Sequence, residues 1–108
     1  MIIKGKITPK QRARYSKHFY TPQPTKQMEE LIRLAYKIQD KTHYGSAPIK
    51  VEIIYTKKNP TTTPDLDNII KLLDALNGIA YDDDKQIVEI IARKEKGEES
   101  LEIKVEKK

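Results

Sequence analysis

The sequence predicts a small α+β domain over residues 1–108, with two helices packed on a mixed β-sheet. Three observations predict this class. Apolar and polar residues alternate over 49–56 and again over 101–105, as in strands that bury one face. Two other segments carry apolar residues at helical spacing. No repeat, linker or low-complexity stretch divides the 108 residues, which are enough for one modest core.

In chain order the pattern predicts β-α-β-α-β-β, and the first half contains one strand, one arm and one helix. The isoleucines of residues 2–7 predict a short strand, which Thr8-Pro9 ends. Residues 8–25 contain three prolines among polar groups, so we expect an extended, mostly irregular arm. An amphipathic helix should follow Thr25 as its N-cap and run to about Thr42, and Gly45-Ser46 should break the chain there.

The second half predicts a strand, a helix and two more strands. The alternation at 49–56 gives the strand, and a second helix follows over 67–77, ended by Gly78. Residues 86–94 are rich in Ile and Val, and this apolar character predicts a strand covered on both faces. The last strand, 101–105, is a candidate for a sheet edge, although its lysines and glutamates oppose edge-to-edge pairing.

Composition and charge limit the possible functions. With no cysteine, the chain has no disulfide, zinc–thiolate site or thiol nucleophile. It lacks both the ~20 apolar residues of a membrane span and a signal-peptide stretch, so we expect a cytoplasmic protein. The 21 Lys and Arg exceed the 16 Asp and Glu, with seven basic residues and no acid in 1–28. This imbalance favours a polyanionic partner, although a charge-rich protein can also simply scatter its charge.

Two acidic segments flank the second helix. Asp65 and Asp67 precede it, and Asp82-Asp83-Asp84 precedes the next strand. The helix over 67–77 would span about 16 Å, and residues 78–82, if extended, would return about 16 Å. We therefore expect the chain to be able to bring Asp83 or Asp84 beside Asp65 and Asp67.

Converging carboxylates favour a hard divalent cation, Mg²⁺ or Mn²⁺, which can assist attack on a phosphodiester. Lys71 lies one helical turn after Asp67 and is placed to hold a phosphate or to stabilise the departing oxygen. Each feature also has a purely structural interpretation. Asp65 and Asp67 can cap the helix, Asp67 and Lys71 can form an ordinary ion pair, and the three successive aspartates can form a solvated turn.

Four short motifs resemble the RusA family of Holliday-junction resolvases. They are Pro64-Asp65-Leu66-Asp67-Asn68, Lys71, Asp74-Ala75-Leu76-Asn77-Gly78 and Asp83-Asp84-Lys85-Gln86-Ile87. The resemblance implies a small homodimeric α+β hydrolase that uses Mg²⁺ to nick four-way DNA junctions symmetrically, in recombination and repair. It implies catalytic roles for Asp65, Asp67, Lys71 and Asp84, with Asp83 as the alternative third metal ligand.

Basic residues supply candidate DNA contacts. Cations bind phosphates without sequence preference. The candidates are Lys10, Arg12, Arg14 and Lys17 of the arm, with Lys57 and Lys58 of the loop after the strand at 49–56. The rival to a junction nuclease is a non-catalytic nucleic-acid-binding or assembly module, in which the aspartates only cap helices and aid solubility.

A homodimer follows from the need to cut two strands at symmetry-related positions, because one chain offers one acidic site. The first helix carries apolar residues, Tyr36 and Ile38, beyond what a small core needs. We therefore expect this helix and a sheet face to form the interface.

Overall fold

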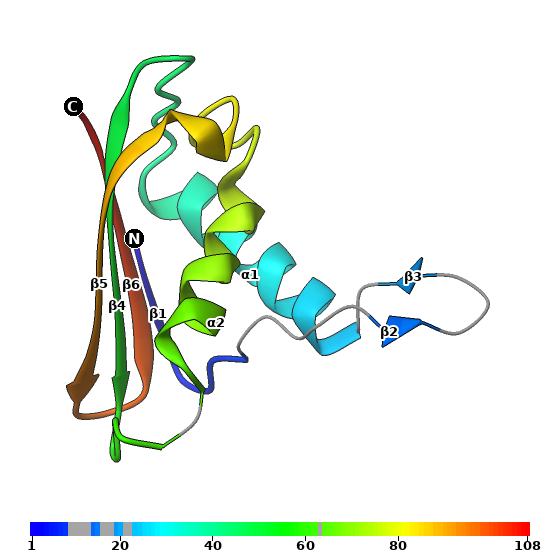
Figure 1. The fold of residues 1–108 in the computed structure, drawn as a ribbon, viewed down its shortest axis with the longest axis vertical. Helices are drawn as coiled ribbons and strands as arrows, with labels where there is room; N and C mark the ends of the chain where they lie inside the picture. The colour runs from blue at the N-terminus through cyan, green and yellow to red at the C-terminus, as the bar shows by residue number, and fades with distance from the viewer. Residues whose placement is uncertain (9–13, 16–18, 21–22, 63) are drawn as a thin grey trace.

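The fold is a four-stranded mixed sheet with helices on one of its faces (Figure 1). The sheet contains β1 (Ile2–Lys4), β4 (Ile49–Lys57), β5 (Ile87–Lys96) and β6 (Ser100–Lys107). The helices are α1 (Gln23–Gln39), α2 (Leu66–Ile70) and the 3-10 helices η1 (Lys71–Leu76) and η2 (Asp84–Gln86), and a separate antiparallel pair joins β2 (Arg14–Tyr15) to β3 (Phe19–Tyr20). The computed structural model describes residues 1–8, 14–15, 19–20, 23–62 and 64–108. The predicted α+β class is confirmed.

The strand order β1-β6-β4-β5 corrects two expectations about the sheet. β6 pairs with both β1 and β4, so the last strand is central and not at an edge. β5 pairs in parallel with β4 alone and forms an edge of the sheet. Its Val88 and Ile90 are 59 % and 42 % exposed, so the expected cover on both faces is wrong. Helices cover only one face of this sheet, and β5 lies at the border of that cover (Figure 1).

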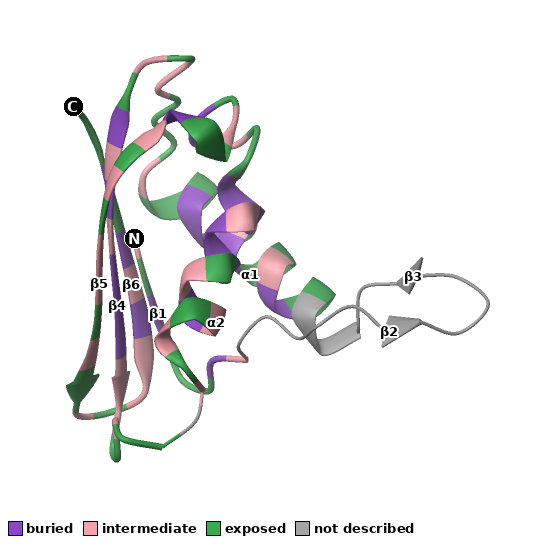
Figure 2. Cartoon of the chain, in the orientation of Figure 1, coloured by how far each residue is buried: buried purple, intermediate pink, exposed green. Residues whose placement is uncertain are grey.

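The core lies between the sheet and the helices (Figure 2). Alternate residues of β4 point into it, and Ile53 at the middle of that strand is fully buried. From the helices, Ile32 of α1 and Leu72 of η1 pack into the same cluster. Each such side chain contributes about 1.5–3 kcal/mol when it is fully removed from water. Three tyrosines are also almost completely buried, and this burial raises the pKa of each phenol above its ordinary value: Tyr36, Tyr55 and Tyr81.

Both helices differ from their predicted bounds for local reasons. α1 begins at Gln23 and ends at Gln39, because Lys41 adopts a left-handed backbone with φ 70° and donates its N–H to the carbonyl of Tyr36. The helix is therefore broken before Gly45-Ser46. The second helix starts at Leu66 and narrows from α to 3-10 geometry at Lys71. No helix of the described residues is long and apolar enough to cross a bilayer.

The N-terminal region also differs from the sequence prediction. β1 ends at Lys4, because Gly5 follows with φ 110°, and Ile7 is buried outside the strand. The arm was expected to be mostly irregular, and the structure describes the β2–β3 pair within it.

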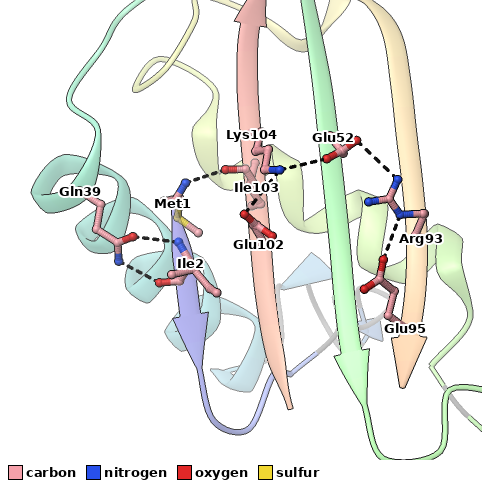
Figure 3. A network of polar contacts seen from close by, with 9 residues as sticks. All are labelled: Met1, Ile2, Gln39, Glu52, Arg93, Glu95, Glu102, Ile103 and Lys104. Atoms are coloured by element: carbon pink, nitrogen blue, oxygen red, sulfur yellow. Dashed lines mark hydrogen bonds and ion pairs between the residues drawn. The ribbon is translucent and has the colours of Figure 1, made fainter. Parts of the chain in front are cut away.

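The face of the sheet away from the helices carries alternating charges (Figure 3). Glu52 of β4 lies 3.6 Å from Arg93 and 3.5 Å from Lys104, and these pairs join three neighbouring strands. At the β1 edge, the Gln39 carboxamide accepts from the N–H of Ile2 and donates to its carbonyl, both at 2.8 Å. Gln39 thereby occupies backbone groups that would otherwise be open to another strand.

Candidate active site

The start of α2 presents two aspartates, Asp65 and Asp67, which we call the helix-start pair. Asp65 is the N-cap in an extended conformation, but its side chain makes no capping hydrogen bond. Asp65 instead uses its backbone, whose carbonyl accepts from the N–H of Asn68 at 3.1 Å. Both aspartates are exposed, and in the described part of the chain no ion pair joins Asp67 to Lys71. The capping and ion-pair interpretations therefore lack the contacts they require.

The chain just before the helix-start pair is fastened to β5 by Lys94. Its ammonium group donates to the carbonyls of Thr62 at 2.7 Å and Pro64 at 2.9 Å. Lys94 pairs with Tyr55 in the sheet, so it links this loop to the end of β4 and β5. No sequence signal indicates this role, because a lysine in a charge-rich strand resembles any other solvated side chain.

The second acidic group is the acidic loop, Asp82 to Asp84, which leads into β5. Asp83 is the N-cap of η2, and its side chain accepts from the N–H of Lys85 at 3.4 Å. A hydrogen bond between the Asp83 and Asp84 carboxyl groups lowers the pKa of Asp83 and raises that of Asp84. The negative charge of Asp74 adds to the rise at Asp84, which brings this residue of η1 into the same electrostatic neighbourhood.

Gln86 fixes the acidic loop to the rest of the fold and is the one buried polar or charged side chain among the described residues. Its Oε1 accepts from the N–H of Asp83 at 2.8 Å, and its Nε2 donates to the carbonyls of Gly45 at 2.6 Å and Ala47 at 2.9 Å. Asp83 and Gln86 form a capping box, a pattern that the spacing Asp-x-x-Gln contains and that sequence reasoning missed.

His43 borders the acidic loop, a position that the sequence did not predict. Its Nδ1 accepts from the N–H of Gly45 at 3.0 Å, and its Nε2 lies 3.5 Å from a carboxylate oxygen of Asp82. The imidazole thus joins the 43–47 loop to the acidic loop, and Gly45, which donates to it, also accepts from Gln86.

The structure does not bring the helix-start pair and the acidic loop together. They lie at opposite ends of the α2–η1 rod (Figure 1), which spans roughly 20 Å at 1.5 Å per α and 2.0 Å per 3-10 residue. The expected return over 78–82 fails because this segment curls into a tight turn. Gly78 has φ 77° and donates its N–H to the carbonyl of Tyr81 at 2.7 Å, and the N–H of Ala80 donates to the carbonyl of Leu76 at 3.0 Å.

The carboxylates of one chain are the right type of ligand for a divalent cation, but the described residues do not gather enough of them in one place. Carboxylate oxygens are the ligands that Mg²⁺ and Mn²⁺ prefer. However, no group of three or more His, Cys, Asp or Glu residues within the described segments is arranged to hold a metal. Among the described residues, one chain presents two aspartates at the helix start and a hydrogen-bonded pair, Asp83 and Asp84, at the acidic loop.

The candidate DNA contacts are only partly described. Lys10, Arg12 and Lys17 lie outside the described residues, and Arg14 is described by its backbone position in β2 alone. Of the other two candidates, Lys58 is exposed and Lys57 is half-buried. Both lie at the end of β4, where the chain leaves the sheet toward the helix-start pair. These two lysines therefore lie on the same side of the fold as Asp65.

The predicted interface residues of α1 separate into two classes. Tyr36 is 1 % exposed and belongs to the core, so its predicted role in an interface is wrong. Ile38 is 67 % exposed and continues a stripe with Leu31 and Leu34, at 43 % and 56 %. The other notable exposed apolar residues lie on strands, with Val88 and Ile90 on β5 and Ile2 on β1.

Comparison with known families identifies one match. The family model described as endodeoxyribonuclease RusA matches residues 4–106. The matched range contains both the helix-start pair and the acidic loop. No curated protein matches the chain.

Proposed function

Because the chain belongs to the RusA family of endodeoxyribonucleases, we propose that it resolves four-way DNA junctions by paired, symmetric, Mg²⁺-dependent nicks. Such an activity would serve DNA recombination and repair. The family match over residues 4–106 supports nuclease action on junction DNA in general. The metal dependence, the symmetry of the nicks and the residue roles below are our proposal.

One observation carries the catalytic interpretation: Asp65 occupies the N-cap position of α2 and yet its carboxylate makes no capping bond. A capping aspartate in a purely structural module would be expected to bond a backbone N–H of the first turn. The carboxylates of Asp65 and Asp67 instead face solvent at the end of the helix where negative charge is stabilised by the helix dipole. The rival non-catalytic module does not account for this arrangement.

Each residue then has a distinct role. Asp65 and Asp67, at one end of the α2–η1 rod, and Asp84, at the other end, would offer carboxylate oxygens to a divalent cation, and Asp83 caps η2 and is the alternative ligand. When bound, the cation supplies charge neutralisation and an acidic water. Lys71, exposed at the junction of α2 and η1, is placed to contact a phosphate oxygen. The arm and Lys57 and Lys58 supply sequence-independent phosphate contacts.

A labelled four-way junction, incubated with the protein with and without Mg²⁺, tests this function. We expect nicks only with Mg²⁺, and little cleavage of a linear duplex of matched sequence. Asp65→Asn should abolish nicking and keep or strengthen junction binding, because it removes a ligand and also a charge that repels phosphate. Asp40→Asn, a change of the same kind at the end of α1, should cleave normally. Binding of the junction without any metal-dependent cleavage would favour the rival module.

A further inference from the structure

The loop that leads from β4 to α2 is held at its start and at its end by different contacts. At its start the carbonyl of Asn59 accepts from the hydroxyl of Thr62 at 2.8 Å, which is a local turn. At its end the contact comes from another element. The Lys94 ammonium group donates to the carbonyls of Thr62 at 2.7 Å and Pro64 at 2.9 Å. The chain just before Asp65 is therefore fastened to the sheet through β5.

Lys94 can reach this loop because it lies on the helix-covered face of the sheet. It pairs with Tyr55 of β4, whose side chain is buried in the core. Ala92, two residues earlier on β5, also packs against the core, and alternate residues of a strand point to the same face. Arg93, the residue between them, points to the opposite face, where it meets Glu52 (Figure 3). Lys94 is half-buried, so water competes less for its two carbonyl partners than at a fully exposed lysine.

The contact with Pro64 acts directly on Asp65. The Pro64 carbonyl belongs to the peptide unit that precedes the Cα of Asp65, and Lys94 holds this carbonyl. The Asp65 carbonyl belongs to the next peptide unit, and the N–H of Asn68 holds it at 3.1 Å. Because each peptide unit is planar, holding both units fixes the φ and ψ of Asp65, which are −67° and 153°. The direction in which the Asp65 side chain leaves the backbone is thereby set, although its carboxylate makes no capping bond.

We infer that Lys94 is a positioning residue for Asp65: it holds the Pro64–Asp65 peptide unit from β5 and so sets the direction of the Asp65 carboxylate. This rests on the proposed function, in which Asp65 acts in nicking. A displacement of about 1 Å at a reacting group can lower a rate by about 100-fold. The role of Lys94 therefore differs from the phosphate contacts proposed for Lys57 and Lys58, because loss of Lys94 should lower the rate of nicking and not the affinity for DNA.

Nicking kinetics of three variants test the inference. Lys94→Met removes both hydrogen bonds and should lower kcat by about 10- to 100-fold, with KM for the junction close to that of the wild type. Lys94→Arg should restore most of the rate, because a guanidinium group can also donate to two carbonyls. Lys107→Met is the control and should change neither constant. It removes the same charge from an exposed position at the other end of the sheet, where Lys107 pairs with Ile49.

Amide hydrogen exchange, measured by NMR on the metal-free protein, provides a second readout. Lys94→Met should speed exchange of the Asn68 amide, whose protection depends on the position of the Asp65 carbonyl. The amide of Gln86, which donates to the Asp83 carbonyl at 3.1 Å, should exchange as in the wild type. A lysine that only raised the global stability would change the protection of both amides together.

Three results would overturn the inference. The first is an unchanged kcat in Lys94→Met, and the second is unchanged exchange of the Asn68 amide. The third is a raised KM with an unchanged kcat, because that result would make Lys94 a DNA contact. If Lys94→Met does not fold, Lys94→Gln, whose side chain is one bond shorter, takes its place with the same expected results. A wild-type protein that does not nick junctions would refute the proposed function separately, while the exchange measurement would still test whether Lys94 holds the chain at Asp65.

Discussion

Replacing Gln86 by methionine should destabilise the fold. The Gln86 carboxamide joins the acidic loop to the 45–47 loop, and both of its polar atoms are hydrogen-bonded in the protein interior. The variant removes three hydrogen bonds, those to the N–H of Asp83 and to the carbonyls of Gly45 and Ala47. The side chain is 8 % exposed, so water cannot readily replace these partners. The Gly45 carbonyl keeps a second donor, the N–H of Asp82 at 3.1 Å.

The expected size follows from these contacts. At about 1 kcal/mol for each hydrogen bond, and more where a buried partner is left without one, Gln86→Met should lower the free energy of unfolding by about 2–4 kcal/mol. A domain of this length has about 5–15 kcal/mol in total. The melting temperature should therefore fall by roughly 10–20 °C.

Gln39→Met is the matched control for this experiment. Its carboxamide also makes two hydrogen bonds to backbone, but at the exposed β1 edge, where water can take over both. This variant should lower the free energy of unfolding by less than about 1 kcal/mol, as measured by urea unfolding followed by circular dichroism. If both variants lost equally little stability, the reasoning that Gln86 anchors the acidic loop would be refuted.

Three other predictions concern the site, the DNA contacts and pH. Asp84→Asn should lose most Mg²⁺-dependent cleavage, and Asp83→Asn should lose less because asparagine keeps the cap; the reverse order in a nicking assay would make Asp83 the third ligand. Arg12→Ala with Arg14→Ala should weaken junction binding and reduce the magnitude of its salt slope by about 0.9 per lost phosphate contact, and an unchanged slope would exclude such contacts. The contribution of the three buried tyrosines to stability should be unchanged up to about pH 10 and should then fall by about 1.4 kcal/mol per pH unit for each phenol, because their folded-state pKa lies above the unfolded one; urea unfolding at pH 9 to 11 measures this.

The sequence predicted those parts of the fold that depend on local pattern. The alternation in β4 and the helical spacing of α1 gave these elements to within a few residues. Pairing between distant segments was not predictable in the same way. β6 lies between β1 and β4 because Ile2 pairs with Glu102, a contact between the two ends of the chain that no local signal encodes. The edge position of β5 follows from that pairing.

The candidate site was predictable in its residue types but not in its geometry. The acidic segments and Lys71 stand out from composition and spacing alone. The separation of the two acidic segments could not be predicted in this way, because it depends on the left-handed backbone of Gly78 and on the tight turn that 78–82 form in place of the expected extended segment. The anchoring roles of Gln86 and Lys94 depend on carbonyl groups far away in the sequence, so only the structure reveals them.

Cleavage of a supercoiled plasmid that extrudes an inverted repeat tests the central claim most directly. Paired nicks across the four-way junction give linear DNA, whereas independent single nicks give open circles. We expect the wild-type protein with Mg²⁺ to produce linear plasmid cut at the repeat, with no product when Mg²⁺ is withheld or when Asp65→Asn is used. An unchanged supercoiled plasmid, or equal cutting of a plasmid without the repeat, would contradict the account.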